Sequence, residues 1–333
     1  MIADDDAIAD AAAVLRRGGL VAMPTETVYG LAGDATNRAA IARIFAVKGR
    51  PADHPLIVHL AEADAIDDWA ESIGPLARAF AAALWPGPLT MVLPRRAHVD
   101  DAVTGGQPTI GLRVPAHPVA LALLRAFGGG LAAPSANRFG RVSPTSAEHV
   151  RADLGDAVDR ILDGGPCSVG LESTIIDLSR GDDDAVILRP GGVGPETIAR
   201  VAGRPIPLRD GGAVRVPGLL ASHYAPRARV LAVPPDALEA TIAAHADLVL
   251  GVIEAGATHG APRWSALGAG WRVVLDPDRE FAHHLYAVLR ELDARGSALI
   301  VATIPAARDL GVAIGDRLRR AAAGRSGSDD ADA

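Results

Sequence analysis

Residues 7–24 read AIADAAAVLRRGGLVAMP, and this stretch contains the pattern that decides the fold class. Apolar residues recur every three to four positions over 7–17, which predicts an amphipathic helix. Gly18 and Gly19 end that helix, and the four apolar residues 20–23 before Pro24 predict a short buried strand. A helix followed at once by a strand indicates an α/β architecture.

The same alternation of helix and strand continues to about residue 200. Helical periodicity recurs at 37–47, 74–84, 117–127 and 145–153. Strand-like apolar runs lie between and after these helices, at 56–60, 90–93, 110–114, 131–133, 173–178 and 185–188. We therefore expect residues 1–203 to form one α/β domain with a twisted mixed sheet.

A chain of 333 residues exceeds the usual size of a single core, so a second domain is expected. Residues 204–228 have no sustained period and carry four prolines, with four arginines against one aspartate, which predicts an extended basic linker. Strands and helices alternate again over 229–323, which predicts a smaller parallel α/β domain of Rossmann-like type. Residues 324–333 are expected to be a disordered tail.

The elements expected after the linker follow from the same two periodicities. Strands are expected at 229–233, 248–253, 271–275 and 298–304, and helices at 236–246, 278–295 and 311–323.

Composition narrows the class of protein. The 49% hydrophobic content and 22% charged content are typical of a globular chain, and the apolar runs are too short and interrupted to span a membrane. The single cysteine, Cys167, excludes an intramolecular disulfide and every multi-cysteine zinc site, so we expect a cytoplasmic protein in which Cys167 is buried filler. A net charge of -7 argues against clamping of nucleic acid by the whole surface.

Lys48 is the only lysine among 33 cationic residues. In a chain so rich in arginine, a surviving lysine is explained most simply if a compact ammonium does something that a planar guanidinium cannot. Asparagine is almost as rare, since it occurs only at Asn37 and Asn137. Lys48 and Asn137 both lie in segments punctuated by glycine or proline, where functional residues are often found.

Three segments at strand or helix ends carry the polar chemistry. Residues 24–31 place two threonines, a glutamate and a tyrosine in one loop, which suits binding of a polar small molecule. Lys48 and Arg50, separated by one glycine, can converge on a polyphosphate. Residues 132–137 add a hydroxyl and an amide after another strand. A nucleotide site is the economical interpretation, although neither a Walker motif nor a dinucleotide glycine fingerprint is present.

Taken together, these motifs resemble the threonylcarbamoyl-AMP synthase family. The resemblance is to the YrdC-type domain in its long form, which adds a linker and a C-terminal domain, and it spans nearly the whole chain. The family's Lys-x-Arg and Ser-x-Asn signature falls on Lys48, Arg50, Ser135 and Asn137. The matching segments are 24–31, 48–59, 88–90, 111–115, 133–137, 143–145, 172–177, 188–191, 216–218 and 222–226.

The resemblance implies a YrdC-type catalytic domain over 1–203, a linker over 204–228 that covers the active site, and a Rossmann-like domain over 229–323. It further implies that L-threonine and bicarbonate form a carbamate that attacks the α-phosphate of ATP, giving threonylcarbamoyl-AMP and pyrophosphate. Mg²⁺ would arrive with ATP and not in a protein metal site. The product would feed the threonylcarbamoyladenosine modification of tRNA by downstream partner proteins, with weak or no direct tRNA binding.

Site residues are carried over from the family by motif position. Lys48, Arg50, Ser135 and Asn137 are the expected catalytic residues. The ATP contacts are expected from Arg50, His54, Thr109, Ser135, Ser143, Arg189 and Tyr224. The threonine contacts are expected from Thr27, His59, Arg113, Ala133 and Ser173. His54 stands where the family usually has asparagine, which puts that nucleotide contact in doubt.

Other interpretations stay open from the sequence alone. His59 also fits a satisfied strand histidine, Tyr224 a packing residue of the linker, and Glu26 and Glu172 capping or loop-bracing carboxylates. A non-catalytic RNA-binding module is a second functional class, against which the acidic first domain argues. A carbamoyl-transfer domain like those of hydrogenase maturation proteins would bring zinc-finger segments, which one cysteine excludes.

Overall fold

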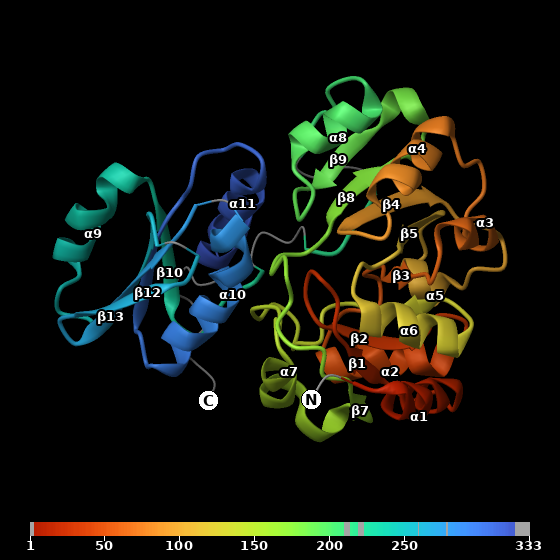
Figure 1. Ribbon diagram of the computed structural model, residues 1–333, viewed down its shortest axis with the longest axis horizontal. Helices are drawn as coiled ribbons and strands as arrows, with labels where there is room; N and C mark the ends of the chain where they lie inside the picture. The colour runs from red at the N-terminus through yellow and green to blue at the C-terminus, as the bar shows by residue number, and fades with distance from the viewer. Residues whose placement is uncertain (1–2, 210–213, 219–222, 259, 278, 324–333) are drawn as a thin grey trace. The chain divides into compact units, whose positions relative to one another are not determined.

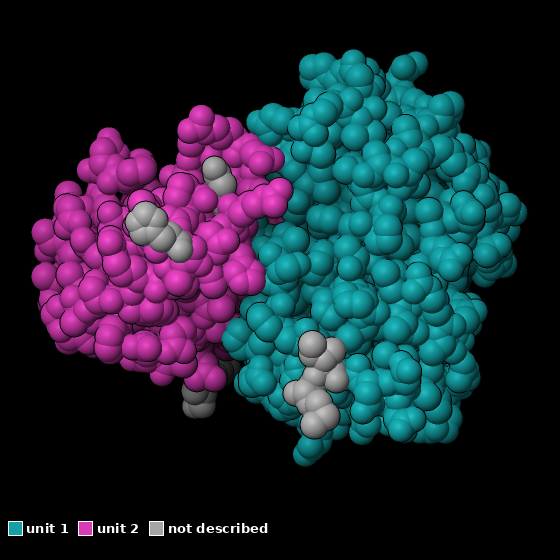
Figure 2. Space-filling view, in the orientation of Figure 1, with its two compact units in different colours: residues 1–139, 143–219 teal, residues 140–142, 220–333 magenta. Residues whose placement is uncertain are grey.

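The computed structural model describes residues 3–209, 214–218, 223–258, 260–277 and 279–323. The chain divides into two compact units, which Figure 2 colours separately. Unit 1 comprises residues 1–139 and 143–219, and unit 2 comprises residues 140–142 and 220–333. The division after residue 219 falls inside the range expected to be a linker, and the expected tail at 324–333 lies outside the described residues.

Unit 1 is built on a nine-stranded mixed sheet with the order β7-β1-β2-β6-β3-β5-β4-β8-β9. Pairing is parallel between β1 and β7, β3 and β5, and β4 and β8, and it is antiparallel at the other five junctions. This confirms the mixed sheet expected from the sequence. The strands are β1 (Val21–Met23), β2 (Gly30–Asp34), β3 (Ile57–His59), β4 (Leu89–Pro94), β5 (Thr109–Arg113), β6 (Leu131–Ala132), β7 (Arg160–Ile161), β8 (Thr174–Asp177) and β9 (Val186–Arg189).

Helices cover both faces of this sheet, because its strands alternate between two apolar cores. Val21 and Met23 join the core formed with α1 (Asp5–Arg16) and α6 (Pro118–Phe127), whereas Ala22 between them joins the core that contains Ile41 and Ile44 of α2 (Arg38–Lys48). Figure 1 shows the helices of unit 1 around the sheet. They are α1 (Asp5–Arg16), α2 (Arg38–Lys48), α3 (Ile66–Trp69), α4 (Pro75–Leu84), α5 (Asp101–Thr104), α6 (Pro118–Phe127), α7 (Ala147–Leu154) and α8 (Pro195–Ala202).

The ends of α2 fix the position of Lys48. The Asn37 side chain caps the start of the helix by accepting hydrogen bonds from the backbone N–H groups of Ala39 and Ala40. Gly49 ends it in the left-handed region, with φ of 64°, which glycine adopts without strain. Lys48 is therefore the last helical residue, and Arg50 follows a sharp change in chain direction.

Strand β2 was not expected from the sequence, which predicted a loop over 24–31. Its residues Gly-Leu-Ala-Gly-Asp lack the β-branched and aromatic side chains that favour strands. The strand forms because β1 and β6 pair with it on both edges. Gly33 leaves little space there for a side chain, since a Cβ atom would lie 3.1 Å from side-chain atoms of both Ile44 and Leu20. Tertiary pairing thus outweighs local propensity.

Part of the range 204–228 runs beside the edge strand β9. The backbone N–H of Ile187 donates to Pro207 O at 2.8 Å, and the N–H of Arg209 donates to Ile187 O at 3.0 Å. Ile206 is buried in the main core of unit 1. Residues 204–209 are therefore packed onto unit 1 and are not a free spacer.

Unit 2 contains a five-stranded sheet with the order β10-β14-β11-β13-β12. The first four strands are parallel to one another, which confirms the expected Rossmann-like arrangement. The elements are β10 (Arg229–Val233), α9 (Leu238–Ala244), β11 (Leu250–Ala255), β12 (Arg263–Leu267), β13 (Gly270–Leu275), α10 (Arg279–Ala294), β14 (Leu299–Thr303) and α11 (Leu310–Ala322).

Edge strand β12 is the one strand of this sheet that the sequence did not predict. It is antiparallel to β13, and most of its residues are exposed, so it carries no buried apolar run. Among the described residues, no helix has the length and apolar character needed to cross a membrane.

Candidate functional site

Two of the predicted polar segments meet within unit 1. Gly30 and Ser135 form an isolated antiparallel bridge. On either side of it, the N–H of Leu31 donates to Pro134 O at 2.7 Å and the N–H of Ala136 donates to Tyr29 O at 2.8 Å. The polar loop over 24–31 and the Ser-x-Asn loop are thus held together by the backbone, although about 100 residues separate them in the chain.

Lys48 attaches the third segment to this pair of loops. Its Nζ atom donates hydrogen bonds to the carbonyl oxygens of Ser135, at 2.5 Å, and Asn137, at 2.7 Å. In the return direction, the N–H of Phe139 donates to Lys48 O at 2.8 Å. Burial, aided by the nearby charge of Arg50, holds the pKa of Lys48 well below its usual range. The expected catalytic residues are therefore close to one another.

Arg50 and His54 lie on the segment after α2. The Nη2 atom of Arg50 donates to Pro55 O at 2.8 Å, which brings the guanidinium back over its own loop. His54 contacts Phe139 edge to face, with ring centroids 5.5 Å apart. Burial and the charge of Arg50 lower the pKa of His54, so this ring favours its neutral form. A neutral imidazole can still donate one hydrogen bond and accept another, as the asparagine usual in the family can.

A deeply buried ion pair joins Arg113 at the end of β5 to Glu26. Arg113 Nη2 lies 2.7 Å from Glu26 Oε1, and both side chains are more than nine-tenths buried. Glu26 Oε2 accepts from the N–H of Ala116 at 2.9 Å, and Arg113 Nε donates to Gly87 O at 3.2 Å. Nη1 makes no hydrogen bond to a described residue, so one face of the guanidinium is left for an anionic ligand.

His59 lies beside Arg113, because β3 and β5 pair in parallel with these two residues in register. Its side chain is buried, and Nδ1 has no hydrogen-bond partner among the described residues. Burial and the charge of Arg113 lower the pKa of His59 to about 3, so the imidazole is neutral at physiological pH. A buried, unpaired ring nitrogen is costly unless a ligand satisfies it.

Thr27 and Ala133 belong to the two loops that meet at the Gly30–Ser135 bridge. The Thr27 hydroxyl lies 2.8 Å from that of Thr25, whose own hydroxyl donates to Val28 O and so bends the loop. Ala133 lies close to Gly30, where an added Cβ would come within 3.2 Å of the Ala133 side chain. Small residues at both positions let the two loops approach each other closely.

Ser173 and Arg189 form a second polar group on β8 and β9. Arg189 Nη2 donates to Ser173 O at 2.8 Å and to Ser173 Oγ at 3.2 Å, and the Ser173 hydroxyl lies 2.8 Å from that of Thr90. Nearby in sequence, Glu172 Oε1 accepts from the Ser143 hydroxyl at 2.6 Å. All five side chains are buried. Buried hydroxyl, carboxylate and guanidinium groups at this density are typical of a site for a polar ligand.

Thr109 begins β5, two positions before Gly111, so both face the same side of the sheet. The two residues line a small pocket together with residues 55–57 and 215–217. Tyr224 belongs to unit 2, where its ring stacks on Tyr286 with centroids 5.7 Å apart. The Arg317 guanidinium lies 4.9 Å from the centre of the same ring. The expected nucleotide contact of Tyr224 stays a prediction.

Sequence reasoning left Glu26 and Glu172 open between capping or loop-bracing carboxylates and metal ligands, and it did not select Thr90. All three contact expected site residues. The usable signal was position, since each lies within a few residues of a motif. Cys167 is buried, and burial raises the pKa of its thiol, as expected of a filler residue. Within the described residues, no group of three or more His, Cys, Asp or Glu side chains could hold a metal ion.

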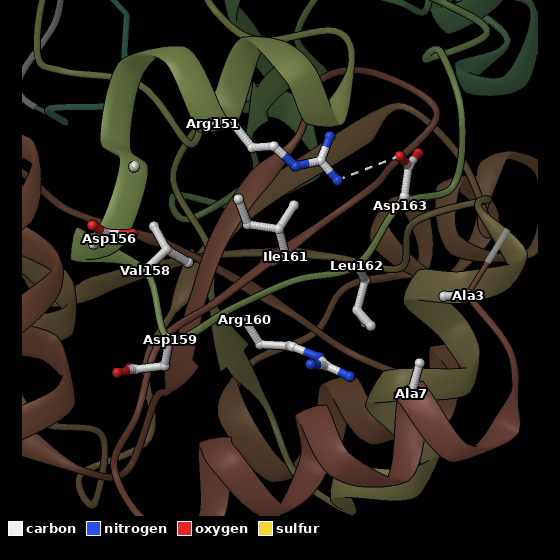
Figure 3. A pocket seen from close by; sticks show the side chains of 11 residues that line it. Ala3, Ala7, Arg151, Asp156, Val158, Asp159, Arg160, Ile161, Leu162 and Asp163 are labelled. Atoms are coloured by element: carbon white, nitrogen blue, oxygen red, sulfur yellow. Dashed lines mark ion pairs between the residues drawn. The ribbon is translucent and has the colours of Figure 1, made fainter. Parts of the chain in front are cut away.

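A larger pocket of about 630 Å³ lies elsewhere on unit 1, between α1, α7 and β7 (Figure 3). Arg151 and Asp163 face each other across its rim, 3.7 Å apart, and the Arg160 guanidinium projects into it. None of the expected site residues lines this pocket. Pocket size alone therefore does not identify the functional site.

Comparison with known proteins places these features in a family. A family model described as telomere recombination matches residues 13–191, and one described as the C-terminal domain of threonylcarbamoyl-AMP synthase matches residues 193–323. A threonylcarbamoyl-AMP synthase from Pyrococcus abyssi is 41% identical over 319 residues, covering 93% of this chain and 92% of the relative. One from Bacillus subtilis is 39% identical over 335 residues, covering 97% and 94%.

A solved structure agrees with both sequence matches. The crystal structure of Pyrococcus abyssi Sua5 complexed with L-threonine has a TM-score of 0.87 to this chain, with 40% identity, and covers 96% of this chain and 94% of that one. Two family models in tandem, relatives similar over their full length and a two-domain structural match agree with one another. The chain belongs to the threonylcarbamoyl-AMP synthase family.

Proposed function

We propose that this protein is a nucleotidyltransferase that makes threonylcarbamoyl-AMP from L-threonine, bicarbonate and ATP. The observation that carries the proposal is the meeting of three motifs far apart in the sequence. Lys48 Nζ binds the carbonyls of Ser135 and Asn137, while Ser135 bridges to Gly30 at the end of the polar loop. The cation that we expect to bind phosphate thus contacts the Ser-x-Asn loop, which in turn pairs with the loop that we expect to bind threonine.

Threonine would bind through the buried pair of strands β3 and β5. The free Nη1 of Arg113 is directed by the Glu26 ion pair and would donate to the α-carboxylate. Nδ1 of neutral His59 lacks a partner among the described residues and would accept from, or donate to, a polar group of threonine. Ala133, whose small side chain lies against Gly30, would border the side chain of threonine.

Two condensation steps follow. The protonated amino group of threonine, R–NH3⁺, combines with bicarbonate to form the carbamate R–NH–COO⁻, releasing one water and one proton. A carbamate oxygen then attacks the α-phosphorus of ATP, a new P–O bond forms, and the bond to the β-phosphate breaks as pyrophosphate leaves. Both partners are anionic, so the contribution of the protein would be positioning and charge neutralisation.

Lys48 and Arg50 would supply positive charge to the triphosphate. Two protons of the Lys48 ammonium are donated to carbonyl oxygens. In the charged form with ATP bound, the third proton would be donated to a phosphate oxygen. Ser135, Ser143, Arg189 and Thr109 would contact the nucleotide. Mg²⁺ would enter bound to the triphosphate and neutralise further charge.

The reaction also sets the cellular context that we propose. The acyl adenylate hydrolyses readily, so proteins that transfer the threonylcarbamoyl group to tRNA would act directly after this one. A single buried cysteine suits the reducing cytoplasm, where such partners work.

An omission assay tests the proposal. Pyrophosphate release is measured with ATP, threonine, bicarbonate and Mg²⁺, and again with each component left out in turn. We expect release to need all four. Release that persists without threonine would show a simple ATP pyrophosphatase and refute the proposal.

A further inference from the structure

Residues 214–217, which we name the strap, pack on the part of the unit 1 sheet that β3, β4 and β8 form. Val216 is buried against Ile57, Val92 and Ile175, which come from three different strands. Thr109 and Gly111 line the same place, and the pocket remaining beneath the strap has a volume of only about 10 Å³. A space of that size barely admits one water molecule. The strap therefore closes this part of the sheet face.

One side chain, that of Gln107, pairs with the backbone of the strap at two points. Its Nε2 donates to Arg215 O at 2.9 Å, and its Oε1 accepts from Arg215 N–H at 2.7 Å. The amide thus imitates one residue of a neighbouring β-strand. Only one orientation of the amide satisfies both bonds, so the assignment of its oxygen and nitrogen follows from the contacts.

The polar contacts of the strap differ in how far they are exposed to water, and therefore in how much they stabilise it. Arg215 forms an ion pair with Asp53 at 3.0 Å, but both side chains are at least half exposed, and such pairs contribute little. Arg189 Nη1 donates to Pro217 O at 2.9 Å, which ties the strap to an expected nucleotide contact. Gln107 is more than nine-tenths buried, so its two bonds to Arg215, and a longer one from Nε2 to Thr104 O at 3.4 Å, are shielded from water and costly to leave unmade.

We propose that Gln107 is a positioning residue that seats the strap over the Thr109 end of the nucleotide site. With the amide paired, Val216 stays in its apolar seat, and water is kept from the bound nucleotide and from the acyl adenylate. The role in catalysis rests on the proposed function, whereas the anchoring itself does not. Gln107 need not touch any substrate, since it acts through the backbone of Arg215.

The test compares Gln107→Met with Asp53→Asn in the full-length chain. Methionine keeps the length and approximate volume of glutamine but removes both hydrogen bonds to Arg215, together with the longer one to Thr104 O. Asp53→Asn is the matched control, because it removes the Arg215 ion pair and leaves the amide pairing intact. Hydrogen exchange of the Arg215 and Val216 amides is measured without ligands. We expect exchange to be about tenfold faster in Gln107→Met and nearly unchanged in Asp53→Asn.

A kinetic readout separates positioning from general damage. For Gln107→Met we expect the KM for ATP to rise about fivefold or more, and the yield of intact threonylcarbamoyl-AMP per pyrophosphate to fall. The KM for threonine is expected to stay within about twofold, because Arg113 and His59 are untouched. A general loss of folding would instead raise the KM for both ATP and threonine and lower the melting temperature of the variant.

The outcomes distinguish the two levels of the proposal. Unchanged exchange at Arg215 in Gln107→Met, with an active wild type, would overturn the anchor. Faster exchange with an unchanged KM for ATP and an unchanged product yield would overturn the sequestering role. A wild-type protein that makes no threonylcarbamoyl-AMP would overturn the proposed function and with it the catalytic role of the strap, while leaving the exchange result to decide the anchor.

Discussion

The Nζ atom of Lys48 lies 2.7 Å from the carbonyl oxygen of Asn137, although 89 residues separate the two in the chain. The same ammonium binds the carbonyl of Ser135. A small tetrahedral donor can serve two converging carbonyls and a third acceptor, whereas a planar guanidinium needs more room and a different geometry. The retention of one lysine in an arginine-rich chain thus has a structural cause as well as the expected catalytic one.

Replacement of Lys48 by arginine is predicted to lower turnover by about tenfold or more without unfolding the protein. The guanidinium cannot hold both carbonyls of the Ser-x-Asn loop and present a proton to phosphate. Steady-state pyrophosphate release measures this effect, and the melting temperature checks the fold. Arg138→Lys is a suitable control, because Arg138 follows Asn137 on the Ser-x-Asn loop and donates to Val47 O of α2 from an exposed position. Near wild-type turnover in Lys48→Arg would remove the special role of the ammonium.

Replacement of Arg113 by alanine is predicted to weaken threonine binding by about 2–5 kcal/mol. The variant loses the carboxylate contact and leaves Glu26 buried without its partner. Isothermal titration with threonine measures the affinity. The double variant Arg113→Ala with Glu26→Gln removes the unpaired charge, so it is expected to recover stability but not threonine affinity. Unchanged threonine affinity in Arg113→Ala would refute the assignment.

The stability of the protein is predicted to depend on pH through His59. The pKa of this group is about 3 in the folded protein, below its ordinary value of 6.5, so the unfolded state binds more protons between these pH values. The contribution of His59 to the free energy of unfolding is complete above pH 6.5. It is lost as the pH falls toward 3, by at most about 1.4 kcal/mol per pH unit.

Urea unfolding of the wild type and of His59→Gln at several pH values measures this contribution. The glutamine variant does not titrate at that position, so the wild type is expected to lose stability faster than the variant below pH 6. Parallel stability curves for the two proteins between pH 6.5 and 4.5 would contradict a neutral, buried His59.

Much of the fold could be predicted because the periodic segments are unambiguous. The helix expected over 7–17 is observed as α1, and the strand expected over 110–114 is observed as β5, each shifted by one or two residues. Strand β2 could not be predicted, since its glycines have poor strand propensity and its neighbours β1 and β6 impose the conformation. Local patterns do not contain such long-range pairing.

Some residues of the candidate site could be predicted from the sequence, whereas the residues that orient them could not. The types and order of residues pointed to Lys48, Ser135 and Arg113, because their motifs are distinctive. The partners that orient them were less predictable: Glu26 was one carboxylate among 40 acidic residues until the fold brought it to Arg113. Gln107 gave no sequence signal, because its partner is the backbone of a residue 108 positions away.

The central claim is tested most directly by following carbon from bicarbonate into the product. The protein is incubated with ATP, Mg²⁺, threonine and ¹³C-labelled bicarbonate, and the nucleotide products are analysed at once by mass spectrometry. The account predicts threonylcarbamoyl-AMP that carries one labelled carbon, formed in equal amount with pyrophosphate before hydrolysis. Pyrophosphate released with unlabelled AMP alone, under conditions in which added threonylcarbamoyl-AMP survives, would contradict it.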